Sequence, residues 1–202
     1  MQSRISLSVW IILCVVLAGC VTSPPARFYT LSSLPDLQPA AKTEAAAGRI
    51  TIGVGPIEVP AYLDRPQIVT RTGPNELQLA EFHRWAEPLA DTLIRTLAEN
   101  ISQLLGSEAV VVVPWKRTKI ETDYQIAVDV IRLDGNIGDA AALVAQWFIS
   151  DSDGKTRAPM HKMRIREPTK GADIRTLVAA QSRAVERLSQ QIAEAARQVI
   201  ED

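Results

Sequence analysis

Residues 124–130 read YQIAVDV, and this alternating stretch decides the fold class of the chain. Ile126, Val128 and Val130 share one side of an extended strand, while the residues between them share the other side. This pattern is typical of a strand in an antiparallel sheet that has one face in the core and the other face accessible. The sequence therefore predicts a strand whose apolar face is covered by other elements.

The residues that follow predict two more strands joined to the first as hairpins. Residues 134–136 (DGN) have turn chemistry, and the apolar residues of 143–149 again alternate. Asp153-Gly154 is a hairpin signal, and 156–166 would close that hairpin. Upstream, shorter segments also favour strands, and the valine run among them indicates a buried one. These segments are 28–31, 49–59, 67–71, 76–80 and 109–113.

Two stretches change to a helical period, with apolar residues three and four positions apart. Pro88 suits the first turn of one helix, and Gly106 suits its C-terminal cap. The apolar positions of this helix are Ala90, Ile94, Leu97, Ile101 and Leu104. The second helix runs from residue 172 to the C-terminus. Its inward positions are Ile174, Val178, Gln181, Val185, Leu188, Ile192, Ala195 and Val199.

Together these elements predict a single α/β domain over 28–202, with a mixed, mostly antiparallel sheet flanked by two long helices. Residues 33–48 are rich in alanine and proline and are interpreted as a flexible surface loop. The second helix is expected to pack on the sheet. The alternative is a coiled-coil or subunit-contact seam.

The first twenty residues resemble a bacterial lipoprotein signal. Arg4 precedes an apolar run at 5–17 that is too short to span a hydrocarbon core of about 30 Å. The sequence LAGC at 17–20 resembles a lipobox, which predicts cleavage after residue 19 and a lipid on Cys20. Residues 20–27 would then be a lipidated tether. Val21, in place of an aspartate, favours the periplasmic face of the outer membrane.

Composition excludes several classes of protein. A net charge of −1 over 202 residues argues against a nucleic-acid binder. The two cysteines, Cys14 and Cys20, both lie in the N-terminal segment, so a zinc ribbon or disulfide framework in the domain is excluded. No catalytic or phosphate-binding motif is present, and 151–154 does not fit a calcium loop. We therefore expect no enzyme activity, no metal and no cofactor.

A membrane-tethered hydrolase is a third and weaker hypothesis for the function. It rests only on His83, which lies among acidic and aromatic neighbours at 81–87 and could act as a general base. The alternative is that this cluster caps the first helix and packs against its N-terminal end. An unchanged envelope phenotype in His83→Ala would remove the hydrolase hypothesis.

A basic group lies near the end of the predicted sheet. Lys162, Arg164 and Arg166 alternate along one strand and would share one face of it. Such charges often protect a solvated sheet edge. The functional alternative is a site for anionic lipid head groups or for an acidic partner.

Three strings carry a resemblance to a known family: YLDRPQIVTR at 62–71, NEL at 75–77 and FHRWAEPL at 82–89. With the lipobox and FYTL at 28–31, the chain resembles the PqiC-like family. These are auxiliary lipoproteins of ABC-type transport systems that contain MCE-domain proteins. The resemblance covers nearly the whole mature chain and is strongest over 49–106.

The resemblance implies a non-catalytic component of a phospholipid transport system. Its partner would be an MCE-domain protein, which it would dock at the outer membrane, and homo-oligomers are plausible because some members form rings. The alternative is a scaffolding lipoprotein for another outer-membrane machine. The residues expected to form a partner-binding surface, or to support the fold, are Tyr62, Asp64, Arg65, Arg71, Arg84 and Trp85. Arg84 is also expected to pair with Glu87.

Overall fold

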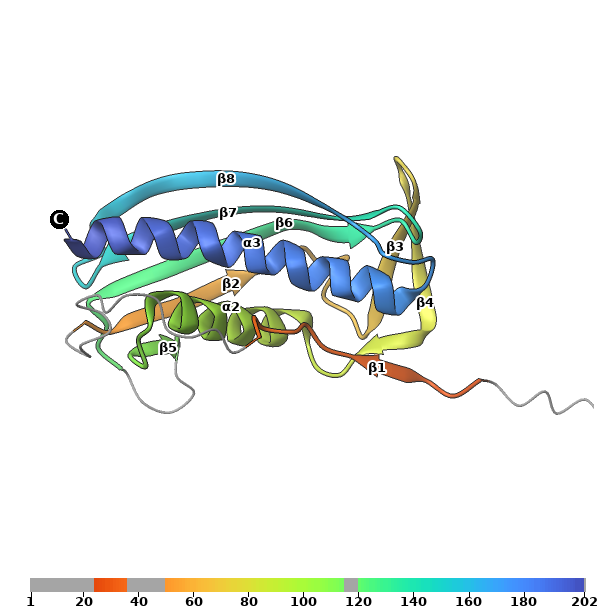
Figure 1. Cartoon of the computed structure of the whole chain (residues 1–202), viewed down its shortest axis with the longest axis horizontal. Helices are drawn as coiled ribbons and strands as arrows, with labels where there is room; N and C mark the ends of the chain where they lie inside the picture. Colours follow the sequence, from red (N-terminus) through yellow and green to blue (C-terminus); the bar gives the residue numbers. More distant parts are fainter. Residues whose placement is uncertain (1–23, 36–49, 115–119, 202) are drawn as a thin grey trace, which may run out of the picture.

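The computed structural model describes residues 24–35, 50–114 and 120–201 and places their strands in two sheets (Figure 1). The larger sheet has five strands in the order β5 (Val110–Val112), β2 (Ile52–Glu58), β6 (Tyr124–Gly135), β7 (Ala140–Asp151) and β8 (Thr156–Pro168). The smaller sheet has three strands in the order β1 (Arg27–Tyr29), β4 (Glu76–Trp85) and β3 (Gln67–Gly73).

The larger sheet is mixed, as the sequence predicts. Strands β6, β7 and β8 form an antiparallel meander, while β2 runs parallel to both β5 and β6. The predicted hairpin turn is confirmed, and Gly154 takes a left-handed φ of 78° there. One expectation is wrong: the valine run forms the short edge strand β5, whose residues are only half-buried.

Two long helices cover one face of the larger sheet (Figure 1). Helix α2 spans Leu89–Leu105 and ends at Gly106, whose φ of 63° closes the last turn as predicted. Helix α3 spans Ile174–Glu201. The inward face of α3 joins the core cluster of the sheet, so packing on the sheet accounts for its apolar stripe. None of the helices in the described part of the chain is long and apolar enough to cross a membrane.

A buried asparagine fixes the segment that follows β1. Asn100 of α2 is fully buried; its Oδ1 accepts a hydrogen bond from the backbone N–H of Leu34 at 2.7 Å, and its amide donates to Ser189 of α3 at 3.0 Å. Leu34 itself is buried, so the start of the predicted loop at 33–48 is held against both helices. The remainder of that loop, from residue 36, lies outside the described residues, as do the signal peptide and Cys20.

The smaller sheet includes residues that the sequence does not assign to a strand. Strand β4 continues to Trp85, five residues beyond the predicted end at residue 80. The cluster around His83 is therefore strand rather than a cap of α2. Strand β1 pairs with it in parallel, with Arg27 opposite His83 and Tyr29 opposite Trp85.

Candidate functional site

Two of the strings that carry the family resemblance meet at a cleft of about 300 Å³. One wall is the connection between β2 and β3, and the other is the connection between β4 and α2. The cleft is lined by Asp64, Arg65, Pro66, Trp85, Ala86, Glu87 and Pro88. The fold therefore brings together three of the residues predicted to bind a partner.

Backbone hydrogen bonds fix the walls of the cleft. The N–H of Trp85 donates to the carbonyl of Pro66 at 2.7 Å, which ties one wall to the other. The N–H of Ala86 donates to the carbonyl of Tyr29 at 2.8 Å, which ties β1 to the same place. The turn before Pro66 is closed by the N–H of Arg65, which donates to Leu63 at 2.8 Å. The cleft is thus held by hydrogen bonds from three chain segments.

Arg65 is the polar side chain in this cleft whose bonding is incomplete. Its Nε is buried and has no hydrogen-bond partner among the described residues. A buried guanidinium nitrogen without a partner is costly, because it has lost water and gained nothing. Asp64 beside it is exposed, and Trp85 is 5% exposed and packs in the core. The cleft therefore offers an exposed carboxylate and a guanidinium whose Nε lacks a partner, on a rigid apolar support.

Arg84 does not make the ion pair that its spacing suggests. Glu87 pairs instead with Arg95, in the second turn of α2. The Nε of Arg84 donates to the backbone carbonyl of Glu81 at 3.4 Å. Residue 84 still lies in β4, while Glu87 lies beyond the end of that strand, so the two do not share a helical turn.

Tyr62 and Arg71 lie in a different place, at the junction of the two sheets. Both donate hydrogen bonds to Asp134, which lies near the end of β6. The side chain of Asp134 is fully buried. Arg71 donates from Nε at 3.2 Å and from Nη2 at 2.8 Å, so its contact is bidentate. The Nε of Arg132 donates at 2.7 Å and the hydroxyl of Tyr62 at 3.3 Å. Arg71 therefore ties β3 of the smaller sheet to the larger sheet, and Tyr62 ties the connection between β2 and β3 to the same carboxylate.

The charge state of this cluster follows from its contacts. Burial alone would raise the pKa of Asp134, but the hydrogen bonds and positive charges of Arg71 and Arg132 outweigh burial and lower it. Burial raises the pKa of the Tyr62 hydroxyl, and the negative charge of Asp134 raises it further. Asp134 is therefore ionised and Tyr62 is a neutral donor at neutral pH.

The lowered pKa of Asp134 predicts a loss of stability in acid. The folded state holds this carboxylate ionised at pH values where the unfolded chain would protonate it, so its contribution is present above the unfolded pKa of about 3.9 and is lost as pH falls below it. We expect the free energy of unfolding in urea to fall as the pH drops below about 4. Asp134→Asn should show a shallower fall. Equal slopes in the two proteins would contradict this assignment.

His83 has a defined structural contact. Its Nδ1 lies 2.7 Å from the hydroxyl of Tyr29, and the two rings lie with their centroids 5.5 Å apart. This bond joins β1 to β4. The described part of the chain contains no cluster of three or more histidine, cysteine or carboxylate side chains that could hold a metal ion.

The basic residues of β8 share the exposed face of that strand, as predicted. Lys162, Arg164 and Arg166 are exposed, while Ile165 and Glu167 between and beside them are buried. Arg166 pairs with Asp139 at 2.5 Å, and both partners are well exposed. This basic stripe lies on the larger sheet and does not line the cleft.

Two buried carboxylates form ion pairs that connect elements of the fold, and the sequence pattern does not predict either of them. Asp134 falls in a segment interpreted as a turn, and Glu167 falls in a segment noted only for its cations. Glu167 is 3% exposed and pairs with both Arg183 and Arg187 of α3. The sequence does contain one signal for Glu167. It is a single acidic residue within the basic run of β8, which indicates a carboxylate that pairs with arginine or lysine.

Comparison with known proteins places the chain in a class of transport auxiliary components. The family model described as the ABC-type transport auxiliary lipoprotein component matches residues 29–193. The chain therefore belongs to the family of ABC-type transport auxiliary lipoproteins. A search of curated proteins found no match.

Two solved structures share the fold. One is a Xanthomonas campestris protein of the DUF330 family, with 20% identity and a TM-score of 0.68 over 86% of this chain and 96% of that one. The other is described only as an uncharacterized protein, with 20% identity and a TM-score of 0.68 over 85% of this chain and 98% of that one. Both support the predicted α/β fold, and the family match confirms the resemblance to PqiC-like proteins.

Proposed function

We propose that the protein is an outer-membrane lipoprotein, anchored through Cys20, that docks the MCE-domain protein of an ABC-type phospholipid transport system. Membership of the transport auxiliary family supports a role beside a transporter. The LAGC sequence at 17–20 supports the lipid anchor, and Val21 supports the outer membrane. The transport chemistry would belong to the partner proteins, and this chain would act by binding.

The observation that carries the docking role is the cleft between Arg65 and Trp85. It joins two distinctive strings of the sequence, and those strings meet the strand that follows the tether. The exposed carboxylate of Asp64 and the incompletely bonded guanidinium of Arg65 suit a polar segment of a partner protein, with a carbonyl or carboxylate facing Arg65. A rigid support also reduces the entropy that binding must overcome.

Recovery of the partner from envelopes tests this role. We expect the native lipoprotein to co-purify with an MCE-domain protein, and Arg65→Ala to reduce that recovery by about tenfold or more, as loss of a central interface residue does. Arg175→Ala is the control, because that side chain is 74% exposed and pairs with Asp173 on the surface. Unchanged thermal midpoints would show that both variants fold.

Failure of the native protein to recover any MCE-domain protein would contradict the docking proposal. The alternative is a scaffolding lipoprotein for another outer-membrane machine, and unbiased crosslinking in the envelope would then identify that machine. Equal recovery by Arg65→Ala and Arg175→Ala would keep the transport role but move the docking surface away from the cleft.

The basic stripe on β8 is a second candidate surface within the same function. Lys162 and Arg164 project from the sheet face that the helices leave open. Such a stripe suits an acidic partner or anionic lipid head groups. Homo-oligomers also belong to this proposal, and the mass of the native complex would establish their size.

A further inference from the structure

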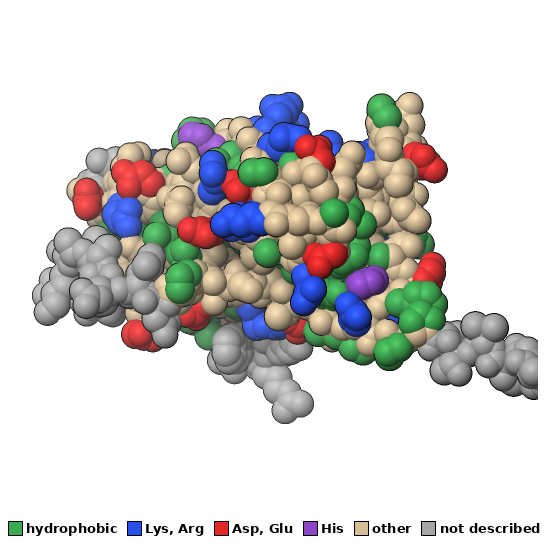
Figure 2. Space-filling model, turned by 45° about the vertical axis from the view of Figure 1, so that its right-hand side comes forward, with side chains coloured by type: hydrophobic (Ala, Val, Ile, Leu, Met, Phe, Trp, Pro, Cys, Tyr) green, Lys and Arg blue, Asp and Glu red, His purple; other side chains and the backbone are tan. Residues whose placement is uncertain are grey.

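The exposed hydrophobic side chains are concentrated at one end of the molecule. Six large hydrophobic residues are more than a third exposed in the described part of the chain: Phe28, Met160, Ile137, Phe82, Leu77 and Ile131. Four of them lie in β1, β4 and the turn between β6 and β7, all of which lie toward the right-hand end in Figure 1. We call Phe28, Leu77, Phe82 and Ile137 the apolar end. Figure 2 shows hydrophobic side chains gathered at the lower right of the molecule.

The tether enters at this same end. The described chain begins at residue 24 and reaches β1 at Arg27 (Figure 1). Phe28 is the eighth residue after Cys20, so the chain can span at most about 29 Å between them. A lipid on Cys20 would therefore keep the apolar end within about 29 Å of the bilayer.

The exposure of Phe28 is fixed by the fold. Its neighbour Tyr29 bonds to His83 at 2.7 Å and accepts a backbone hydrogen bond from Ala86 at 2.8 Å. Phe28 is consequently 66% exposed, and Phe82 on the adjoining strand is 42% exposed. Aromatic side chains exposed together on a rigid surface indicate an interaction site. The neighbouring anchor indicates which surface they meet.

We propose that the apolar end rests in the interfacial region of the bilayer that holds the lipid on Cys20. This proposal rests on the proposed anchoring. The aromatic rings suit the boundary between head groups and acyl chains, where aromatic residues concentrate in membrane proteins. Arg27 and Lys170 are exposed at this end, but so are Glu76 and Glu81. The contact is therefore driven by the apolar side chains and needs no anionic lipid.

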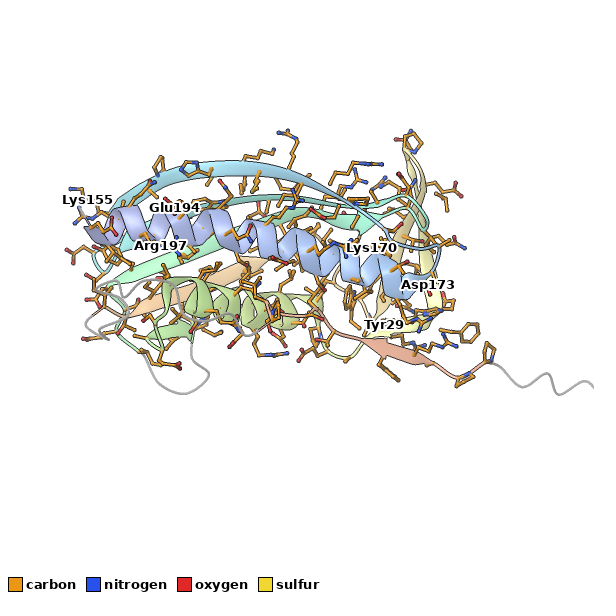
Figure 3. All side chains as sticks on the ribbon, in the orientation of Figure 1. Tyr29, Lys155, Lys170, Asp173, Glu194 and Arg197 are labelled. Atoms are coloured by element: carbon orange, nitrogen blue, oxygen red, sulfur yellow. The ribbon has the colours of Figure 1, made fainter. Side chains whose placement is uncertain are left out.

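Single labelling sites test the contact on the intact lipoprotein. Cys20 is the one cysteine of the mature chain and would be consumed by its lipid, so an introduced cysteine can be labelled alone. We choose Ile137→Cys at the apolar end and Lys155→Cys at the opposite end, where Figure 3 labels Lys155. Each protein carries an environment-sensitive fluorophore and is reconstituted into phosphatidylcholine vesicles that contain spin-labelled phosphatidylcholine. We expect quenching at position 137 and none at position 155.

Matched substitutions then identify the side chains responsible. Phe28→Ser with Phe82→Ser should abolish the quenching at position 137. Met160→Ser should leave it unchanged, because Met160 is 60% exposed on β8, beside the distant Gly154 hairpin. Flotation with the vesicles shows for every variant that the anchor is present.

The outcomes separate the contact from the anchor. Flotation without quenching at position 137, or with equal quenching at both positions, would overturn the contact and leave the anchored lipoprotein in place. Loss of flotation in the unsubstituted protein would overturn both proposals. Retained quenching after the double substitution would show that the aromatic side chains do not make the contact.

Discussion

Asp134→Ala should lower the free energy of unfolding by about 3 kcal/mol, as removal of one member of a buried ion cluster does. The carboxylate accepts hydrogen bonds from Arg71, Arg132 and Tyr62, and its side chain has no exposed surface. Without it, two guanidinium groups lie close together with no negative charge between them. Urea unfolding followed by circular dichroism measures the change.

Asp139→Ala provides the comparison for this prediction. Asp139 also pairs with an arginine, but its side chain is 58% exposed and that of Arg166 is 64% exposed. An exposed pair contributes between about 0 and 1 kcal/mol, so this variant should unfold almost like the original protein. Similar losses in the two variants would show that the Asp134 cluster does not hold the sheets together.

Cys20→Ser should abolish lipid labelling and leave the unprocessed precursor in the cell. The thiol is the group that would carry the diacylglycerol, and a hydroxyl cannot form the thioether. The expected effect is complete, because the signal sequence would be cleaved only after the cysteine is modified. Metabolic labelling with a fatty acid, together with the mass of the protein, measures both consequences.

Cys14→Ser is the matched control for the anchor. Cys14 lies within the predicted signal peptide and would be discarded, so this variant should be processed and labelled normally. A mature, lipid-labelled product from Cys20→Ser would contradict the lipobox assignment. A mature, lipid-labelled product from Cys14→Ser, with none from Cys20→Ser, would support the lipobox assignment.

Local pattern was sufficient to predict most of the fold. The alternation in β6 and β7 and the helical periods of α2 and α3 reflect burial on one face, and each appears in the structure. The extension of β4 was missed because it depends on β1, which lies more than fifty residues away in the sequence. Parallel pairing with a three-residue strand leaves no periodic signal of its own.

Asp134 was missed for a similar reason. A bulge between Val130 and Arg132 shifts the phase of β6, so that Leu133 joins the core and Asp134 moves to the opposite face. There Arg71 and Tyr62 cover it. The sequence predicted those two residues as a shared surface or support, and the structure gives them a supporting contact. Asp64, Arg65 and Trp85 instead line the cleft, so the distinctive strings divide between two places.

The length of α3 has a consequence for the distance at which the protein works. Its 28 residues span about 42 Å at 1.5 Å per residue, and it runs along the long axis of the molecule (Figure 1). If the apolar end rests on the bilayer, the Gly154 hairpin stands roughly 40 Å from that bilayer. The domain would then hold its far tip at a fixed distance from the membrane, while the cleft between Arg65 and Trp85, which β1 adjoins, would stay close to the anchor.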